Sequence, residues 1–158
     1  FKREILAGIH FLTAHTRTGS SAIGADTFKV AMFTNSSSID ADTTGYTTSN
    51  EVSGTNYTAG GTTFASVTIG LADNSSSVPT AFVDAADTTW SSSTISSARG
   101  ALIYNSTLST AGTGSTTNHA ADPSVAVINF GGDKASSAGD FTIQWPTNDA
   151  NSAIIRIA

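Results

Sequence analysis

The sequence of 158 residues contains no cysteine and only three prolines. Disulfides, thiolate catalysis and cysteine-based zinc sites are therefore excluded. Charged side chains make up 12% of the residues, about half their usual share in a soluble domain. The few positive charges form no basic cluster, so we expect no nucleic-acid partner. No apolar run approaches the roughly 20 residues that span a bilayer, and the charged start is unlike a signal peptide, so no membrane partner is expected either.

Hydroxyl groups take the place of charges in this chain. It has 25 threonines and 23 serines, and 39% of its residues are hydrophobic. Disorder goes with low hydrophobicity and high net charge, so this composition predicts a folded domain. Threonine is β-branched and suits the pleated, half-solvated surface of a sheet. The length is sufficient for one domain with a core of its own.

The first twelve residues differ from the rest of the chain. Apolar side chains recur there at helix-like spacing: Phe1, Ile5, Leu6, Ile9 and Leu12. This spacing predicts a short amphipathic helix or a docking arm. Residues 13–26 consist largely of Thr, Gly, Ser and Ala and indicate a loop. We therefore assign residues 1–26 to an N-terminal docking arm and loop.

Alternation of apolar and polar side chains predicts strands in the remainder. The candidate strands are residues 27–34, 62–71, 79–84, 88–96, 99–106, 124–130, 140–145 and 153–157. Turn-forming clusters such as Gly131-Gly132-Asp133 separate them. The apolar C-terminal strand has to be buried in a sheet or against a neighbour. Short strands without helical periods between them predict an all-β fold, a jelly-roll-like β-sandwich over residues 27–158.

Residue types that bind metals or catalyse reactions are present but scattered. His10 and His15 lie five residues apart, whereas two ligands on one helix face usually lie four apart. Aspartates close to predicted turns are explained by bonds to their own backbone; they are Asp84, Asp87, Asp122, Asp133 and Asp140. We therefore predict no metal site and no cofactor.

An enzymatic function is not predicted. The sequence has no G-x-S-x-G nucleophile elbow. The only two glutamates, Glu4 and Glu51, do not indicate the carboxylate pair of a glycosidase. With so many serines, the three residue types of a Ser/His/Asp hydrolase occur together by chance.

Four aromatic residues are candidates for a carbohydrate platform: Phe82, Trp90, Tyr104 and Trp145. Large rings dominate small cores, so core packing is the better interpretation of Phe82 and Tyr104. Trp145 stands before Pro146 at the end of a predicted strand. We expect it to be half exposed and to make an intersubunit contact.

Five segments carry a resemblance to known proteins. They are KREILAGIH at 2–10, TFKVAMFT at 27–34, ARGALIYN at 98–105, VAVINFGGDK at 125–134 and the run from FTIQW to NSAIIRIA at 141–158. Together they resemble a family of small virion structural proteins of tailed bacteriophages, encoded among head and tail genes. The chain departs from the pattern of that family in a longer polar connection at 107–121 and in the loop at 14–24.

The resemblance implies a repeated component of the virus particle. We expect a capsid decoration (cement) protein on the outer surface of the virion, which binds the major capsid protein and copies of itself as a homotrimer. The expected capsid-docking residues are Phe1, Lys2, Arg3, Ile5, Leu6 and Ile9. The alternative is a tail-fibre or adhesin module that recognises a host surface through residues 35–61 and 107–121.

Overall fold

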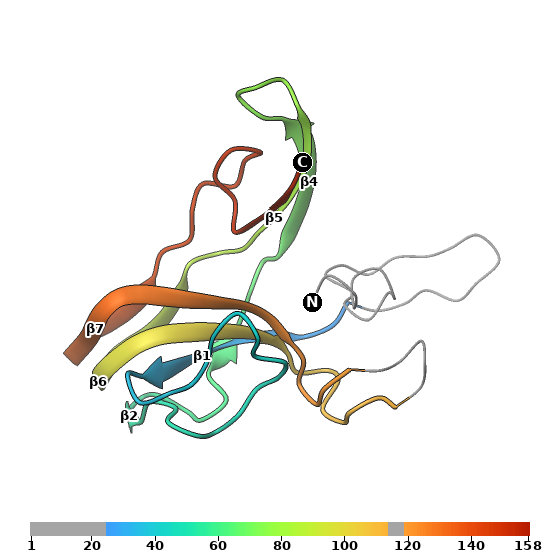
Figure 1. The fold of residues 1–158 in the computed structure, drawn as a ribbon. Helices are drawn as coiled ribbons and strands as arrows, with labels where there is room; N and C mark the ends of the chain where they lie inside the picture. Colours follow the sequence, from blue (N-terminus) through green and yellow to red (C-terminus); the bar gives the residue numbers. More distant parts are fainter. Residues whose placement is uncertain (1–24, 114–118) are drawn as a thin grey trace.

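The computed structural model describes residues 25–113 and 119–158, and all regular secondary structure in these two ranges is β-strand. Every strand pair is antiparallel, and the strands form two sheets (Figure 1). The all-β prediction is confirmed, whereas the jelly-roll arrangement stays a prediction. The predicted docking residues from Phe1 to Ile9 lie outside the described residues, and so do His10 and His15.

A five-stranded sheet forms the larger body of the molecule. Its strands are β1 (Phe28–Thr34), β2 (Gly54–Thr55), β3 (Thr62–Thr63), β6 (Thr88–Asn105) and β7 (Ser124–Ile143). β6 lies at the centre: β7 pairs with one of its edges, while β1 and β2 pair with successive parts of the other. β3 continues the sheet beyond β1. Segments far apart in the sequence are therefore joined through β6.

β6 and β7 are much longer than the sequence predicts, with 18 and 20 residues. The predicted strands 88–96 and 99–106 are one strand, and so are the two predicted strands that flank Gly131-Gly132-Asp133. The turn predicted there is wrong: Gly131 has a φ of 72° within β7, and the register between β6 and β7 shifts at several points. Bulges use the same glycine-rich sequences as turns, but they bend a strand instead of ending it. Figure 1 shows the resulting curl of both strands.

Apolar side chains are buried on both faces of the five-stranded sheet. On one face, Phe28, Val30 and Met32 of β1 belong to the main hydrophobic cluster together with side chains of β6 and β7. On the opposite face, Ala31 and Phe33 pack with side chains of β6, and residues of the connection 35–61 lie against them. The alternation predicted for residues 27–34 is thus confirmed, with both sets of side chains inside.

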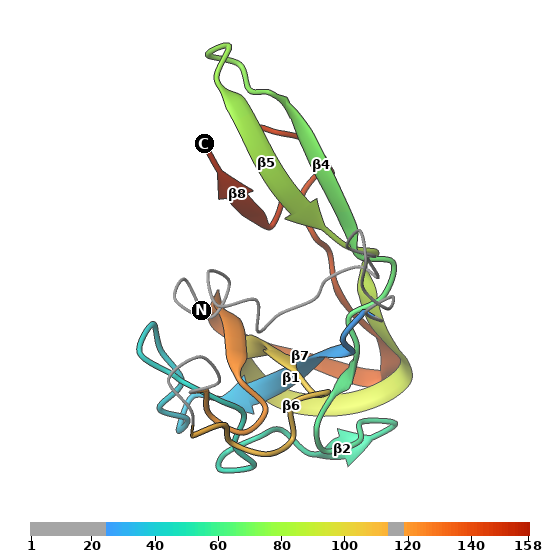
Figure 2. The same ribbon diagram turned by 90° about the vertical axis from the view of Figure 1, so that its right-hand side faces the viewer.

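The smaller sheet has three strands in the order β4-β5-β8: β4 (Thr68–Asp73), β5 (Pro79–Asp84) and β8 (Ile155–Ile157). β5 coincides with the predicted strand 79–84, whereas the predicted strand 62–71 is divided between β3 and β4. The apolar C-terminal strand pairs with β5, as the sequence requires. Figures 1 and 2 show that this sheet extends away from the five-stranded sheet.

Residues 146–153, which connect β7 to β8, cover one face of the smaller sheet. The side-chain amide of Asn148 donates a hydrogen bond to the Thr68 hydroxyl at 2.9 Å, and the backbone N–H of Ser75 donates one to the Asn151 side-chain oxygen at 2.7 Å. Thr80 and Asp84 are buried on β5. The connection therefore acts as a cover for this face only.

Candidate binding surfaces

The other face of the smaller sheet presents mainly apolar side chains. Two rows of side chains run across β4, β5 and β8. The first row consists of Ile69, Val83 and Ile155, and the second row consists of Leu71, Ala81 and Ile157. Directly paired residues point to the same side of a sheet. These six side chains therefore form one continuous surface, which we call the apolar face.

Four of the six side chains of the apolar face are exposed, whereas Val83 and Ile155 are half-buried and Ile155 packs against the main hydrophobic cluster. Ile69 is 53% exposed, Leu71 74% and Ile157 60%. In Figure 2 the segment after β7 passes behind β4 and β5, and no described segment crosses in front of them. Antiparallel sheets usually turn their apolar side to a core. An exposed apolar patch of this kind marks an interaction site in a soluble protein.

The sequence predicts the strands of this surface but not the surface itself. The pairs Ile69/Leu71 and Ile155/Ile157 each flank a small or polar residue, which is a signal that predicts a strand. Ala81 and Val83 instead flank Phe82. That these three pairs share one open face follows only from the pairing of β4, β5 and β8. Ile157 remains 60% exposed in spite of the pairing with β5, whereas Ile155 of the same strand is half-buried and packs against the main hydrophobic cluster.

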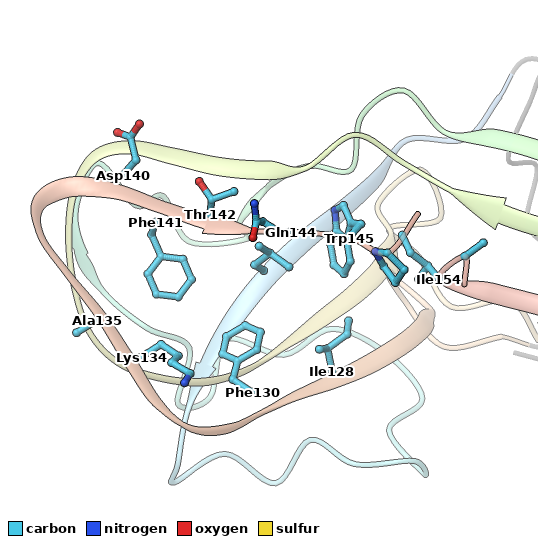
Figure 3. Close-up of a pocket in the computed structure, with 13 residues that line it drawn as sticks. Ile128, Phe130, Lys134, Ala135, Asp140, Phe141, Thr142, Gln144, Trp145 and Ile154 are labelled. Carbon is cyan, nitrogen blue, oxygen red and sulfur yellow. The ribbon is translucent and has the colours of Figure 1, made fainter. Parts of the chain in front are cut away.

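A second apolar surface is an open groove on the inner side of the curled strand β7. Its volume is about 680 Å³, and its lining includes Ile128, Phe130, Phe141, Trp145 and Ile154. Figure 3 shows Phe130 and Phe141 pointing into the hollow from opposite limbs of β7. The groove borders the main hydrophobic cluster. It is therefore a part of the core that the described chain leaves uncovered.

Trp145, the predicted intersubunit contact, lines this groove and is half buried. Its backbone N–H donates to the Asp87 carboxylate at 2.9 Å, and its indole N–H donates to the Thr88 hydroxyl at 3.1 Å. Its ring stands at 87° to that of Phe64, with centroids 5.5 Å apart. Trp145 is thus held in place by its own chain and presents its ring to the groove.

One charged residue, Asp73, stands at the border of the apolar face, and two charged residues, Lys134 and Asp140, are in the lining of the groove. Asp73 lies two residues after Leu71, at the end of β4, and is exposed. Lys134 is exposed on β7 and lines the groove. Neither Asp73 nor Lys134 forms an ion pair within residues 25–113 and 119–158. In these ranges Arg99 and Asp133 form an ion pair, with 3.3 Å between the guanidinium nitrogen and the carboxylate oxygen. Asp73 and Lys134 are therefore opposite charges without an ion-pair partner in the described parts of the chain.

Glu51, considered above for glycoside hydrolysis, has a structural setting. It accepts hydrogen bonds from the hydroxyls of Tyr46 and Tyr57 and from the backbone N–H of Gly60. The hydroxyl of Tyr104 donates to the carbonyl of Gly60 at 2.7 Å, and the rings of Tyr46 and Tyr104 are stacked. The carboxylate therefore holds parts of the connection 35–61 together, and Tyr104 links this connection to β6. The other glutamate, Glu4, lies outside the described residues.

The aspartates near predicted turns do not converge on a site. The carboxylates of Asp84, Asp87 and Asp140 each accept one backbone N–H, and Asp133 pairs with Arg99. Burial raises the pKa of Asp122, and Lys29 partly opposes this rise. No group of three or more histidines, aspartates or glutamates placed to share a metal ion occurs among the residues that the structure describes.

The four candidate platform residues lie apart from one another. Trp90 is in the main cluster, with its ring against those of Tyr57 and Phe141. Tyr104 is buried on the opposite face of the five-stranded sheet. Phe82 lies on the covered face of the smaller sheet, where its register partner on β4 is Gly70. Of the four, Trp145 alone lines the groove.

Within the described parts of the chain, no helix is long and apolar enough to cross a membrane. A scan against protein-family models finds no match for the chain, and searches of curated proteins and of solved structures find none either.

Proposed function

We propose that the chain is a non-enzymatic structural component of a tailed-phage virion, a capsid decoration protein that binds and stabilises the head shell. The observation that carries this proposal is the apolar face, which leaves Ile69, Leu71 and Ile157 largely exposed. A surface of this kind favours permanent contact with a neighbouring protein. The resemblance to virion structural proteins supports the same class of function.

The size of the apolar face suits a repeated assembly. Burial of a large aliphatic side chain contributes about 1.5–3 kcal/mol when it starts fully exposed, and the three side chains above start about half to three-quarters exposed. Stable interfaces bury about 800 Å² per partner, more than six aliphatic side chains supply. A single contact is therefore modest, and many contacts on one particle multiply its effect.

The proposed partners are the major capsid protein and copies of the chain itself, arranged as a homotrimer on the outer surface of the virion. The docking role of Phe1, Lys2, Arg3, Ile5, Leu6 and Ile9 remains part of this proposal. A chain with 12% charged residues and many hydroxyl groups is compatible with close lateral contacts. The groove and the apolar face are the two surfaces best suited to such contacts.

Labelled particles test the proposal. Phage particles that carry a tagged chain are imaged by electron microscopy, and the copy number is measured by quantitative mass spectrometry. A decoration protein is abundant and covers the head. Label confined to the tail, at low copy number, contradicts the decoration role and favours the tail-fibre alternative. Turnover of a polysaccharide by the purified chain contradicts the non-enzymatic assignment.

A matched pair of variants tests the role of the apolar face. Leu71→Asp places a charge on the face, whereas Ala72→Asp places the same charge on the adjacent exposed residue of β4, which points to the opposite side of the strand. We expect Leu71→Asp to lower occupancy on particles at least tenfold and Ala72→Asp to leave it unchanged. Equal occupancy of the two variants would show that the apolar face does not contribute to binding of the chain on the particle.

A further inference from the structure

We infer that the apolar face of one copy of the chain seats in the β7 groove of a second copy, in a head-to-tail contact. The inference rests on the proposed function, in which the chain binds copies of itself, and it names the two surfaces that meet. The face is on the sheet β4-β5-β8, and the groove is on β7 of the other sheet. Because the two surfaces differ, the contact is heterologous, and it forms a ring wherever its rotation closes.

Within residues 25–113 and 119–158, the apolar face and the groove do not cover each other. Figure 1 shows that β4 and β5 extend away from the curl of β7 that contains the groove. The connection 146–153 lies on the other side of the smaller sheet, and its bonds to Thr68 and Ser75 hold it there. The apolar face therefore points away from the parts of its own chain that the structure describes. A second copy brings a groove to it.

The two surfaces match in chemistry. The face presents aliphatic side chains, of which Leu71 is the most exposed at 74%. The groove presents the rings of Phe130, Phe141 and Trp145 and the side chain of Ile128. Its volume of about 680 Å³ lies in the range of pockets that enclose small apolar ligands. It is large enough to receive several aliphatic side chains of a neighbouring strand.

The charge of Asp73 is complementary to that of Lys134 in the groove; the other charged residue of the groove lining, Asp140, accepts the backbone N–H of Ser92. Asp73 stands beyond Leu71 on the same side of β4, and Lys134 lines the groove that receives Leu71 in the proposed contact. Neither has an ion-pair partner among the described residues of its own chain. A head-to-tail contact brings the carboxylate of one copy to the ammonium group of the next. Opposite charges at the rim of an interface fix its register and exclude the reversed orientation.

A two-fold contact between two apolar faces is the competing arrangement. It covers the face but leaves the groove open, and it brings together two copies of the surface that ends in Asp73. In the head-to-tail arrangement every copy uses both surfaces, so that each chain gains two contacts instead of one. Two contacts compensate for the small area of each. The observations therefore favour the head-to-tail arrangement.

Mixing of variants distinguishes the two arrangements. Leu71→Asp disables the face, and Ala135→Glu places a charge at an exposed position that lines the groove. The matched controls are Ala72→Asp and Ser137→Asp, which are exposed positions outside the two surfaces. The mass of each purified full-length chain is measured by sedimentation equilibrium and native mass spectrometry over a range of concentrations. Circular dichroism confirms that each variant retains its strands.

The wild-type chain and both controls are expected to form closed oligomers. Leu71→Asp and Ala135→Glu, each measured by itself, are expected to remain monomeric. Their equimolar mixture is expected to form a dimer with one copy of each, because one intact face and one intact groove remain. Asp73→Lys and Lys134→Asp are each expected to weaken association at least tenfold, and the double variant to recover it. A two-fold contact instead gives oligomers of Ala135→Glu and no rescue in the mixture.

Three outcomes overturn the inference. They are a wild-type chain that stays monomeric at every concentration, an Ala135→Glu variant that associates like the wild type, and a mixture without the mixed dimer. None of these measurements contains particles, so they are independent of the occupancy experiment. Loss of particle binding with intact self-association would instead contradict the proposed function and leave the head-to-tail contact in place.

Discussion

The hydroxyl of Tyr57 donates a hydrogen bond to the carboxylate of Glu51 at 2.7 Å, and it accepts one from the backbone N–H of Met32 at 2.9 Å. Through this hydroxyl, a residue of the polar connection 35–61 is linked to β1 in the middle of the sheet. The same carboxylate receives the hydroxyl of Tyr46 and the backbone N–H of Gly60. One side chain therefore holds several turns of an otherwise irregular segment.

Replacement of Glu51 by Gln is expected to destabilise the fold. The amide accepts hydrogen bonds through one oxygen only, so at least one donor of the network loses its acceptor. Loss of a charge-assisted hydrogen bond in a partly buried site costs about 1.5–3 kcal/mol in the free energy of unfolding. Urea denaturation measures this cost, and Asp42→Asn, at an exposed position of the same connection, is the control.

A double-mutant cycle separates the network from the general effect of the substitution. Tyr57→Phe removes one hydrogen-bond donor to Glu51. The loss in the free energy of unfolding in the double variant should therefore be smaller than the sum of the losses in Tyr57→Phe and Glu51→Gln. Strict additivity of the two costs would contradict the proposed coupling between these side chains.

The three tyrosines of this region predict a loss of stability at alkaline pH. Burial raises the pKa of Tyr104 to about 12, with further contributions from Asp122 and Glu51. Burial also raises the pKa of Tyr46 and of Tyr57, and their hydrogen bonds to Glu51 add to the rise. Above the ordinary tyrosine pKa of 10.0, the unfolded chain releases protons before the folded one does. The free energy of unfolding therefore falls as pH rises.

The stabilisation from Tyr104 is complete below pH 10 and is lost as the pH approaches 12. Denaturation curves at successive alkaline pH values measure the fall, and the ultraviolet absorbance of tyrosinate follows ionisation in the same samples. Tyr57→Phe removes one of the titrating groups and should make the fall less steep. Stability that is independent of pH between 10 and 12, or an equally steep fall in Tyr57→Phe, would refute this explanation.

The sequence predicts individual strands well because alternation is a local property. Residues 27–34 and 79–84 correspond closely to β1 and β5. It fails at Gly131, because a positive φ serves a bulge as well as a turn, and only the partner strand decides between the two. The apolar face depends on pairing between β5 and the distant β8, which no local pattern contains. The role of Glu51 likewise depends on tyrosines brought together by the fold.

Gly70 is expected to be required for the position of Phe82 on the covered face of the smaller sheet. A Cβ atom at position 70 would lie 2.2 Å from the ring of Phe82, its register partner on β5. Gly70→Ala therefore forces this half-buried ring out of its place, at a cost of about 1–3 kcal/mol in the free energy of unfolding. Thermal or urea denaturation measures the loss.

The combination Gly70→Ala with Phe82→Ala identifies the cause. If the ring is what the new methyl group meets, Gly70→Ala should cost much less in the Phe82→Ala background than in the wild type. An unchanged cost would indicate that the backbone of β4, and not the ring, requires glycine. The adjacent substitution Ala72→Ser, at an exposed position of the same strand, should change stability by less than about 0.5 kcal/mol.

Trp145 reports directly on the groove, because it is one of only two tryptophans. Trp90 is 5% exposed in the core, so its emission is expected to change little when copies associate. In a Trp90→Phe background Trp145 is the single emitter. If the groove receives a neighbouring chain, its emission maximum should shift to shorter wavelength as the protein concentration rises, because the ring leaves water. Quenching by acrylamide should decrease over the same range.

The response of Trp145 to a second substitution makes the measurement specific. Adding Leu71→Asp should abolish the concentration-dependent shift, because the apolar side chain that enters the groove is lost, whereas adding Ala72→Asp should preserve it. A shift that persists with Leu71→Asp would mean that another surface covers Trp145. An emission that is independent of concentration in every variant would show that the groove stays open to water. The sequence-based prediction of Trp145 as an intersubunit contact would then be wrong.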